Sequence, residues 1–356
     1  MATLADVAKR AGVSKATVSR ILNGRPLDIA VREETRLRVE RAAAELGYRP
    51  SLFAQGLRTK RTRLVGVIVR DLTNPFWAGL LEGITTTCVA RGYHVTLSHT
   101  RTESEQVSEA SLLADLGSDG MLVVGEHRGD EAALAQLLTE SRATVVVARS
   151  GASLGVPSVG VDNTSAVRMA VDHLVALGHS RIAFLGGGSD DARERHRAFV
   201  DACLGRGVPL RSEYVCVLDR RGPLSIAAAV RLGRSMARRL LALPEPPTAV
   251  LTTSDGLAFG AVAGVQSKGY AIPDDVSIVG FDGLPFSRFA SPPLTMVQQP
   301  VRDMGVVAAN LLIDIIEDKA PRRSATEIRL PARLVVRSSC GPPRFKSGIS
   351  QLAVRG

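Results

Sequence analysis

The 356-residue sequence lacks the long apolar runs and the leader pattern that carry a protein into or across a membrane. No run of about 18 apolar residues is present, so a membrane-spanning protein is disfavoured. The N-terminus has no charged segment followed by an apolar one, which disfavours a secreted protein. The length allows two or three domains that each bury a core. We therefore expect a cytoplasmic protein.

Metal-binding and catalytic motifs are missing as well. The four cysteines, Cys88, Cys203, Cys216 and Cys340, lie too far apart for a CxxC motif, and the six histidines include no HExxH. Buried, reduced thiols are expected, with no metal and no cofactor. A complete GxGxxG, a phosphate-binding P-loop and a GxSxG elbow are absent, which leaves an enzyme only as an alternative of low prior.

Positive charge is concentrated at the N-terminus. Residues 1–63 hold 14 lysines and arginines against 6 acidic residues, whereas the other 293 residues hold 31 against 29. A polyanion-binding module on a near-neutral body has this asymmetry, because neutralising phosphates releases counterions. A solvated basic face has the same composition, so charge alone does not decide between the two.

Two short amphipathic patterns meet at a glycine in TLADVAKRAGVSKATVSRILNG, residues 3–24. In the first, Thr3 is a candidate N-cap and Gly12 ends the helix; the apolar positions are Leu4, Val7, Ala8 and Ala11. In the second, Ser14 is the candidate cap and Asn23-Gly24 the stop; the inner positions are Thr17, Val18, Ile21 and Leu22. The outer face then carries Lys15, Ala16, Ser19 and Arg20.

A third run, AVREETRLRVERAAAELGY, predicts a helix that ends at Gly47. Its mostly helical spacing is set by Val31, Thr35, Leu37, Val39, Ala42 and Leu46. Two helices joined by a tight turn, the second with small polar and basic side chains, indicate a helix-turn-helix that lays its second helix in the major groove. Lys15 and Arg20 would then reach bases or phosphates. An ordinary helical hairpin is the alternative.

From Leu64 onward, short apolar runs alternate with amphipathic stretches. The runs are LVGVIV, HVTLSH, GMLVVG, TVVVA, SVGVD, RIAFLGG, TAVLTT and VSIVGFD, and helices are expected near 76–91, 104–116, 130–140 and 164–177. This alternation predicts parallel sheets with helices on both faces, in two units. Ligands bind such sheets at the carboxyl ends of the strands, where this chain has polar residues: Asp71 to Asn74, Asp162, Ser254-Asp255 and Asp282.

The segment TLADVAKRAGVSKATVSRILNG resembles the DNA-binding headpiece of the lactose-repressor (LacI/GalR) family of bacterial transcription regulators. The stretches DLTNPFWAGLLEGI, GVDNTSAV, LGHSRIAFLGG, VSIVGFDG and LTMVQQP extend the resemblance over nearly the whole chain. It implies an N-terminal all-α helix-turn-helix headpiece followed by an α/β, periplasmic-binding-protein-like (type I) effector domain of two lobes. The implied function is a sequence-specific transcriptional regulator, a repressor, controlled by a small molecule.

The resemblance also implies domain boundaries. Residues 1–48 would form the DNA-binding domain, 49–63 the hinge helix and linker, 64–340 the effector-binding and dimerisation domain, and 341–356 a tail. Lobe 1 would comprise about 64–161 and 292–322, and lobe 2 about 162–291 and 323–340, with crossovers near 161, 291 and 323. The tail has no leucine heptad for a coiled coil, so a homodimer on a pseudo-palindromic DNA site is expected.

In the family, the first two residues of the recognition helix and the arginine four or five places later read the operator, and these match Lys15, Ala16 and Arg20. Ala16 offers only an apolar contact, so Lys15 and Arg20 would carry the polar readout. The matching hinge segment folds on DNA, and its leucine, here Leu57, wedges into the minor groove; packing alone is the other possibility for Leu57. Gln55-Gly56 replaces the usual Arg-Ser pair, which makes hinge ordering more dependent on DNA. The full set of implied DNA contacts is Thr3, Ser14, Lys15, Ala16, Thr17, Ser19, Arg20, Asn23, Tyr48, Leu57, Arg58 and Lys60.

The residues that match the family's effector contacts are Phe76, Trp77, Asp162, Ser189, Asp191, Arg195, Asp255 and Asp282. An arginine fork and carboxylates can each bind vicinal hydroxyls, and a flat aromatic ring covers the apolar face of a pyranose, so a sugar is the expected effector, neutral rather than phosphorylated. Core packing is the alternative for Trp77, a surface charge cluster the alternative for Arg195, and a structural role the alternative for Asp282. The family's usual glycine three residues after this arginine is here Ala198.

Two other classes share the α/β body. A periplasmic sugar-binding protein would carry a signal peptide and no basic headpiece, and a nucleotide-dependent enzyme would need a phosphate loop. Neither of these two protein classes accounts for residues 1–63. The sequence therefore favours the interpretation as a cytoplasmic, nucleoid-associated DNA-binding regulator.

Overall fold

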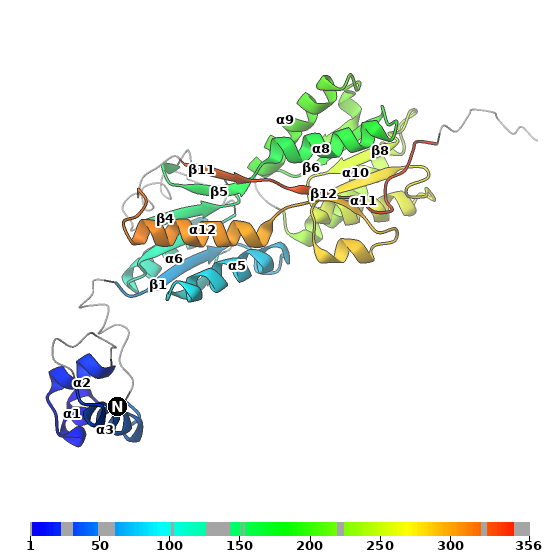
Figure 1. Cartoon of the computed structure of the whole chain (residues 1–356). Coiled ribbons are helices and arrows are strands. Elements are labelled where there is room, and N and C mark those ends of the chain that lie inside the picture. Colours follow the sequence, from blue (N-terminus) through cyan, green and yellow to red (C-terminus); the bar gives the residue numbers. More distant parts are fainter. Residues whose placement is uncertain are drawn as a thin grey trace, which may run out of the picture. The chain divides into compact units, whose positions relative to one another are not determined.

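The computed structural model describes residues 2–22, 31–48, 61–100, 103–125, 143–149, 151, 154–218, 224–321 and 326–344. The chain divides into two compact units, Met1–Arg63 and Leu64–Gly356. In its described part the first unit is helical and the second is an α/β body with two sheets (Figure 1).

The helical unit consists, where described, of α1 (Leu4–Ala11), α2 (Lys15–Leu22) and α3 (Glu33–Glu45). These helices enclose one small core, made up of Val7, Ala8, Ala11, Val18, Val39, Ala42 and Ala43. Leu37 and Leu46, predicted to face this core, are 54% and 37% exposed. Leu37 lies two residues before the buried Val39, which places it on the opposite side of a helix with 3.6 residues per turn.

The first sheet of the second unit has six strands in the order β11-β5-β4-β3-β1-β2, all paired in parallel. Their bounds are β1 Leu64–Val69, β2 His94–His99, β3 Gly120–Val124, β4 Ala143–Val147, β5 Ser158–Val161 and β11 Glu327–Leu330. Strands β3 and β4 are buried along their whole length, as expected for a parallel sheet covered on both faces.

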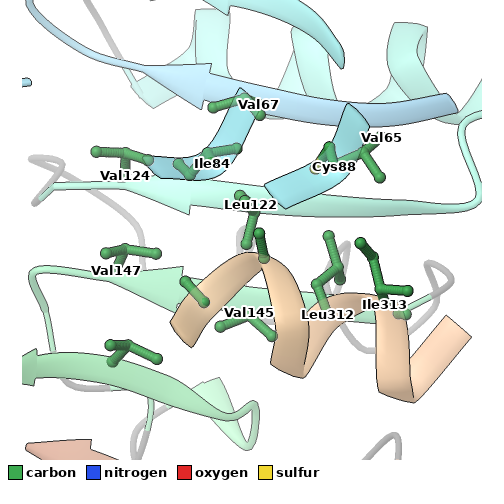
Figure 2. Packing of buried hydrophobic residues seen from close by; sticks show 14 of the residues in the cluster. Val65, Val67, Ile84, Cys88, Leu122, Val124, Val145, Val147, Leu312 and Ile313 are labelled. Atoms are coloured by element: carbon green, nitrogen blue, oxygen red, sulfur yellow. The ribbon is translucent and has the colours of Figure 1, made fainter. Parts of the chain in front are cut away.

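Helices cover both faces of this sheet. α5 (Phe76–Ala90) and α12 (Val301–Ile316) lie together on one face, and α6 (Glu103–Asp115) lies on the other. Figure 2 shows the first of these cores, with its labelled side chains coming from β1, β3, β4, α5 and α12: Val65, Val67, Ile84, Cys88, Leu122, Val124, Val145, Val147, Leu312 and Ile313.

The second sheet also has six strands, in the order β12-β10-β9-β8-β6-β7, all parallel except the β10–β12 pair. Its strands are β6 Ile182–Gly186, β7 Val215–Val217, β8 Ala249–Thr252, β9 Ser277–Asp282, β10 Thr295–Gln298 and β12 Arg333–Val335. α8 (Asn163–Ala176) and α9 (Asp190–Gly205) pack on one face, and α10 (Ile226–Leu240) and α11 (Asp255–Gln266) on the other. Short 3-10 turns run over Ser212–Tyr214 and Pro285–Phe289.

The predicted helices near 76–91, 104–116 and 164–177 are confirmed as α5, α6 and α8. The helix predicted near 130–140 lies outside the described residues.

In the part of the chain that the structure describes, three segments connect the two lobes, and two of them lie elsewhere than predicted. The first follows β5 at Asp162, close to the expected position. The second, predicted near 291, comes after β10, because β10 pairs in parallel with β9 of the second sheet; it is Gln299-Pro300. The third, predicted near 323, comes after β11, which pairs with β5 of the first sheet; it is Pro331-Ala332. The first lobe therefore includes 326–330, and the second lobe includes 292–298.

Candidate functional site

Both ends of α1 are fixed by local capping features. Thr3 forms a capping box with Asp6, in which the Thr3 backbone N–H donates to Asp6 Oδ2 at 2.8 Å. These Thr3 hydrogen bonds lower the pKa of the Asp6 carboxyl. Gly12 ends α1 with φ of 66°, a left-handed conformation that glycine adopts without steric cost.

The beginning of α2 is held in the same way. Ser14 Oγ accepts a hydrogen bond from the Thr17 backbone N–H at 3.1 Å and lies 2.9 Å from the Thr17 hydroxyl. On the outside of α2, Lys15, Ala16 and Arg20 are exposed, whereas Ser19 is half-buried. Among the described residues neither Lys15 nor Arg20 forms an ion pair. The helix therefore offers two cationic side chains and a methyl group on one side.

The other predicted DNA contacts include one residue that is less accessible to DNA and several that the structure does not describe. Tyr48 is half-buried and packs against the core of the helical unit. Asn23, Leu57, Arg58 and Lys60 lie outside the described residues.

A cavity of about 160 Å³ lies between the two lobes, at the carboxyl ends of strands of both sheets. The first lobe contributes apolar and amide groups, and the second contributes most of the charged ones. Seven of the eight predicted effector contacts line it: Phe76, Trp77, Ser189, Asp191, Arg195, Asp255 and Asp282.

The first-lobe wall is aromatic. Phe76 and Trp77 begin α5, and their rings meet edge to face with centroids 4.9 Å apart and an interplanar angle of 82°. Asn74 Oδ1 accepts a hydrogen bond from the Phe76 backbone N–H at 3.1 Å, which fixes the start of the helix. Trp77 both lines the cavity and packs against the first-lobe core, so a pocket position and core packing do not exclude each other for this residue.

Arg195 lies at the centre of the opposite wall and is 5% exposed. Its Nε donates to Asn163 Oδ1 at 2.8 Å, and its Nη1 donates to the Thr253 carbonyl at 2.7 Å. Nη1 also lies 3.4 Å from Asp282 Oδ1, and the guanidinium stacks 3.8 Å from the centroid of the Phe281 ring. Most of its donors are thus used within the protein.

Two carboxyl groups, Asp255 and Asp282, lie next to each other at the ends of β8 and β9. Both Asp255 oxygens accept from the Leu284 backbone N–H, at 3.1 and 3.2 Å. Burial, reinforced by the charge of Asp282, raises the pKa of Asp255 to about 8. Asp282 accepts from Gln299 Nε2 at 2.7 Å, and burial raises its pKa despite the neighbouring Arg195. The pair therefore disfavours two full negative charges.

The first turn of α9 supplies the remaining polar groups. Ser189 caps this helix by accepting from the Ala192 backbone N–H at 3.1 Å. Asp191 Oδ2 lies 3.8 Å from Arg195 Nη2, and burial raises the pKa of this carboxyl more than the arginine lowers it. Among the described lining residues, three acidic side chains thus share the cavity with one arginine.

Asp162 is the predicted effector contact that the structure places differently. It does not line the cavity described here; its Oδ1 caps α8 by accepting from the Ser165 backbone N–H at 3.0 Å. Burial raises the pKa of Asp162, but the Ser165 hydrogen bonds and the nearby Arg329 lower it overall. The carboxylate is turned into its own helix, as a residue before a helix N-terminus commonly is.

Sequence reasoning missed Asn163 and Gln299. Asn163 is 1% exposed and holds Arg195, and Gln299 is 6% exposed and holds Asp282. Asn163 follows the first crossover and Gln299 belongs to the second, but the sequence alone gives no signal of the distant side chains that they hold.

Within the described part of the chain, no group of His, Cys, Asp and Glu side chains has the arrangement of a metal site. The same described residues include no helix long and apolar enough to span a bilayer.

Comparison with known proteins agrees with these two units. The family description "Bacterial regulatory proteins, lacI family" matches residues 3–51, and "Periplasmic binding protein-like domain" matches residues 171–340. Both descriptions fall on the unit in which the corresponding feature, the helix-turn-helix or the two-lobed body, is observed.

Relatives match over nearly the full length. The chain is 34% identical over 344 residues to catabolite control protein A of Priestia megaterium, covering 95% of this chain and 98% of that protein. A crystal structure of the lac repressor dimer bound to operator and an anti-inducer matches with a TM-score of 0.82 and 27% identity, covering 96% and 99% of the two chains. The complex of the transcriptional regulator CelR with cellobiose matches with a TM-score of 0.68 and 30% identity, covering 95% and 100%. The chain therefore belongs to the lacI family of bacterial regulatory proteins and is a DNA-binding transcriptional regulator under small-molecule control, not an enzyme.

Proposed function

We propose that the chain is a repressor that reads a pseudo-palindromic operator with α2 of two copies. The observation that carries this proposal is the exposed face of α2. This face carries Lys15, Ala16 and Arg20, and the helix follows the turn at Gly12. Arginine and lysine bind guanine O6 and N7 in the major groove, and an alanine methyl contacts a thymine methyl. The lac repressor was solved as a dimer on its operator, and two-fold symmetry of this kind requires an inverted repeat.

We assign residues 1–48 to DNA binding, 49–63 to the hinge, and Leu57 to a wedge between base steps of the minor groove. Arg58 and Lys60 would contact phosphates in this arrangement. The regulator then acts in the cytoplasm on the DNA of the nucleoid.

The cavity between the lobes is the proposed effector site, and the proposed effector is a sugar. Phe76 and Trp77 supply an apolar, aromatic wall, while Asp191, Arg195 and Asp282 lie opposite with hydrogen-bonding groups. This combination suits a pyranose, which has an apolar face and a rim of hydroxyls. CelR was solved with cellobiose, which supports the same class of ligand here.

The charge of the cavity argues for an effector without an anionic group. Three carboxyl groups face one guanidinium, and the guanidinium already donates to Asn163, Thr253 and Asp282. A phosphorylated sugar would enter a site whose carboxyls already repel each other, and the described lining residues include no second arginine to neutralise it.

The DNA-binding proposal is tested by incubating the purified chain with a random duplex library at moderate salt and sequencing what it retains. Recovery of an inverted repeat supports two recognition helices on one site. Recovery of salt-sensitive duplexes with no shared motif contradicts sequence-specific reading.

The effector proposal is tested by titrating a panel of neutral sugars and their phosphorylated or uronic forms while Trp77 fluorescence is followed. Trp77 is the single tryptophan of the chain, so the signal comes from the cavity wall. A response to neutral members and none to the charged ones is expected. Silence across the panel contradicts both the site and the ligand class.

A further inference from the structure

A chain of side-chain hydrogen bonds connects the cavity with the lobe crossovers. Asn163, the first residue of α8, follows the first crossover and is 1% exposed. Its Oδ1 accepts from Arg195 Nε at 2.8 Å, and its Nδ2 donates to Asp191 Oδ1 at 3.2 Å and to Glu194 Oε2 at 2.7 Å. Three residues of α9 thus hold one buried amide, and two of them, Asp191 and Arg195, line the cavity.

Glu194 connects this cluster to the other lobe. Its second oxygen, Oε1, accepts from Arg329 Nη1. Arg329 belongs to β11, a strand of the first sheet, where it stands opposite Gly160 in parallel register. It lies two residues before the third crossover, and Figure 1 shows β11 beside β5 and leading toward β12. The Glu194 carboxylate therefore binds Asn163, which belongs to the second lobe, and Arg329, which belongs to the first sheet.

This position has a mechanical consequence. A rotation of the lobes about their crossovers changes the separation between α9 and β11, and with it the Glu194–Arg329 contact. A group that binds Asp191 or Arg195 in the cavity acts on the side chains that hold Asn163, and Asn163 is the other partner of Glu194. Cavity contacts and lobe arrangement thus act on the same side chain.

We propose that Glu194 is the positioning residue that couples the polar wall of the cavity to the arrangement of the two lobes. The proposal rests on the proposed function, because it takes the cavity as the effector site. In the arrangement described, the Glu194–Arg329 ion pair restrains the lobes, and the Glu194–Asn163 hydrogen bond connects that restraint to Asp191 and Arg195. A purely structural ion pair would change the stability of the chain but not the access to the cavity.

Acrylamide quenching of Trp77 measures access to the cavity without any effector or DNA. E194Q keeps the shape of the side chain, removes its charge and leaves one end unable to accept a hydrogen bond. Since the lost restraint lets the lobes separate more often, we expect the quenching constant to rise by about 1.5- to 3-fold. R329Q should have the same effect, and the double variant should add little to either single change.

E327Q is the matched control. Glu327 also contacts the Arg329 guanidinium, with Oε1 3.1 Å from Nη2, but it lies on the same strand and joins no lobes. Its quenching constant should equal that of the unmodified chain. Thermal unfolding of each variant checks that it is folded, and E194D, which is too short to hold both partners, replaces E194Q if that variant does not fold.

The coupling to the cavity is tested by D191A in two backgrounds. D191A should change the Trp77 quenching constant in the unmodified chain. In the E194Q background the change should be less than half as large, because Asp191 acts on the lobes through its hydrogen bond to Asn163 and the hydrogen bond of Asn163 to Glu194. Equal effects of D191A in both backgrounds overturn the proposal, and so does an E194Q quenching constant equal to that of E327Q. These measurements involve no DNA, so a failed operator selection rejects the proposed function alone.

Discussion

The backbone of Gly125 lies directly against the indole of Trp77: a Cβ atom at this position would be 3.2 Å from Cζ2 and 3.3 Å from Cη2. Gly125 directly follows the buried strand β3 and has φ of 80°, so this position needs a residue that tolerates a left-handed backbone and has no side chain. The edge of the indole can therefore approach the end of the strand, where Trp77 forms part of the aromatic wall of the cavity.

G125A is therefore expected to change the cavity as well as the stability. An L-residue in the left-handed region costs about 1–2 kcal/mol, and the added methyl group displaces the indole. G269A is the control, since Gly269 has φ of 77° but open space around its missing side chain. Both variants should lose stability in urea unfolding, but only G125A should shift the Trp77 emission spectrum. Equal spectra would show that the indole does not depend on Gly125.

Two basic residues are predicted to contribute to DNA binding in different ways, one to sequence preference and the other to affinity for any duplex. R20A should cost about 1–3 kcal/mol of binding and relax the preference at one position of each half-site. K60A, in the proposed hinge, should weaken binding to all duplexes alike and lower the slope of affinity against salt. Affinity for the selected duplex and for single-position variants of it provides the measurement. A uniform loss in both variants would remove Arg20 from the reading surface.

Arg195 is predicted to be the most sensitive side chain of the cavity wall. R195Q leaves the Thr253 carbonyl without its donor and removes the cation beside Asp282 in a buried site, and breaking a buried pair in this way costs about 3–5 kcal/mol. R206Q is the comparison, because the Arg206–Asp172 pair is largely exposed and solvent screens it, so its loss should cost much less. Urea unfolding of the two variants gives the difference. Similar losses would mean that the guanidinium is not essential to the packing of this wall.

The sequence predicts a large part of this architecture because its signals are local. Alternating apolar runs mark the strands, and Asp255 and Asp282 could be placed at strand ends that meet at one edge of a sheet. The second and third crossovers could not be located in this way, since the pairing of β10 with β9 and of β11 with β5 depends on contacts between distant segments. Asn163 and Gln299 were missed for the same reason: each acquires its role from Arg195 or Asp282, which lie far away in the chain.

The raised pKa of Asp255 predicts how stability depends on pH. In the unfolded chain this carboxyl loses its proton near its ordinary value of 3.8, whereas in the folded chain it keeps the proton up to about pH 8. A raised pKa of this kind favours the folded state fully below pH 3.8, and the advantage is lost as pH rises toward 8. Within that window the free energy of unfolding should fall by on the order of 1.4 kcal/mol per pH unit from this group.

D255N removes this titration while keeping an oxygen that can accept from the Leu284 N–H. We therefore expect the free energy of unfolding of D255N to decline less steeply than that of the unmodified chain between pH 5 and pH 7.5, as measured by urea unfolding. The flattening should also include part of the contribution of Asp282, because the charge of Asp282 is one cause of the raised pKa of Asp255 and the two carboxyls repel each other. D172N, which changes a half-buried carboxylate of α8 paired with Arg206 outside the cavity, should follow the unmodified chain. Parallel curves for D255N and the unmodified chain would show that Asp255 is ionised at neutral pH and adds its negative charge to the cavity wall that contains Arg195.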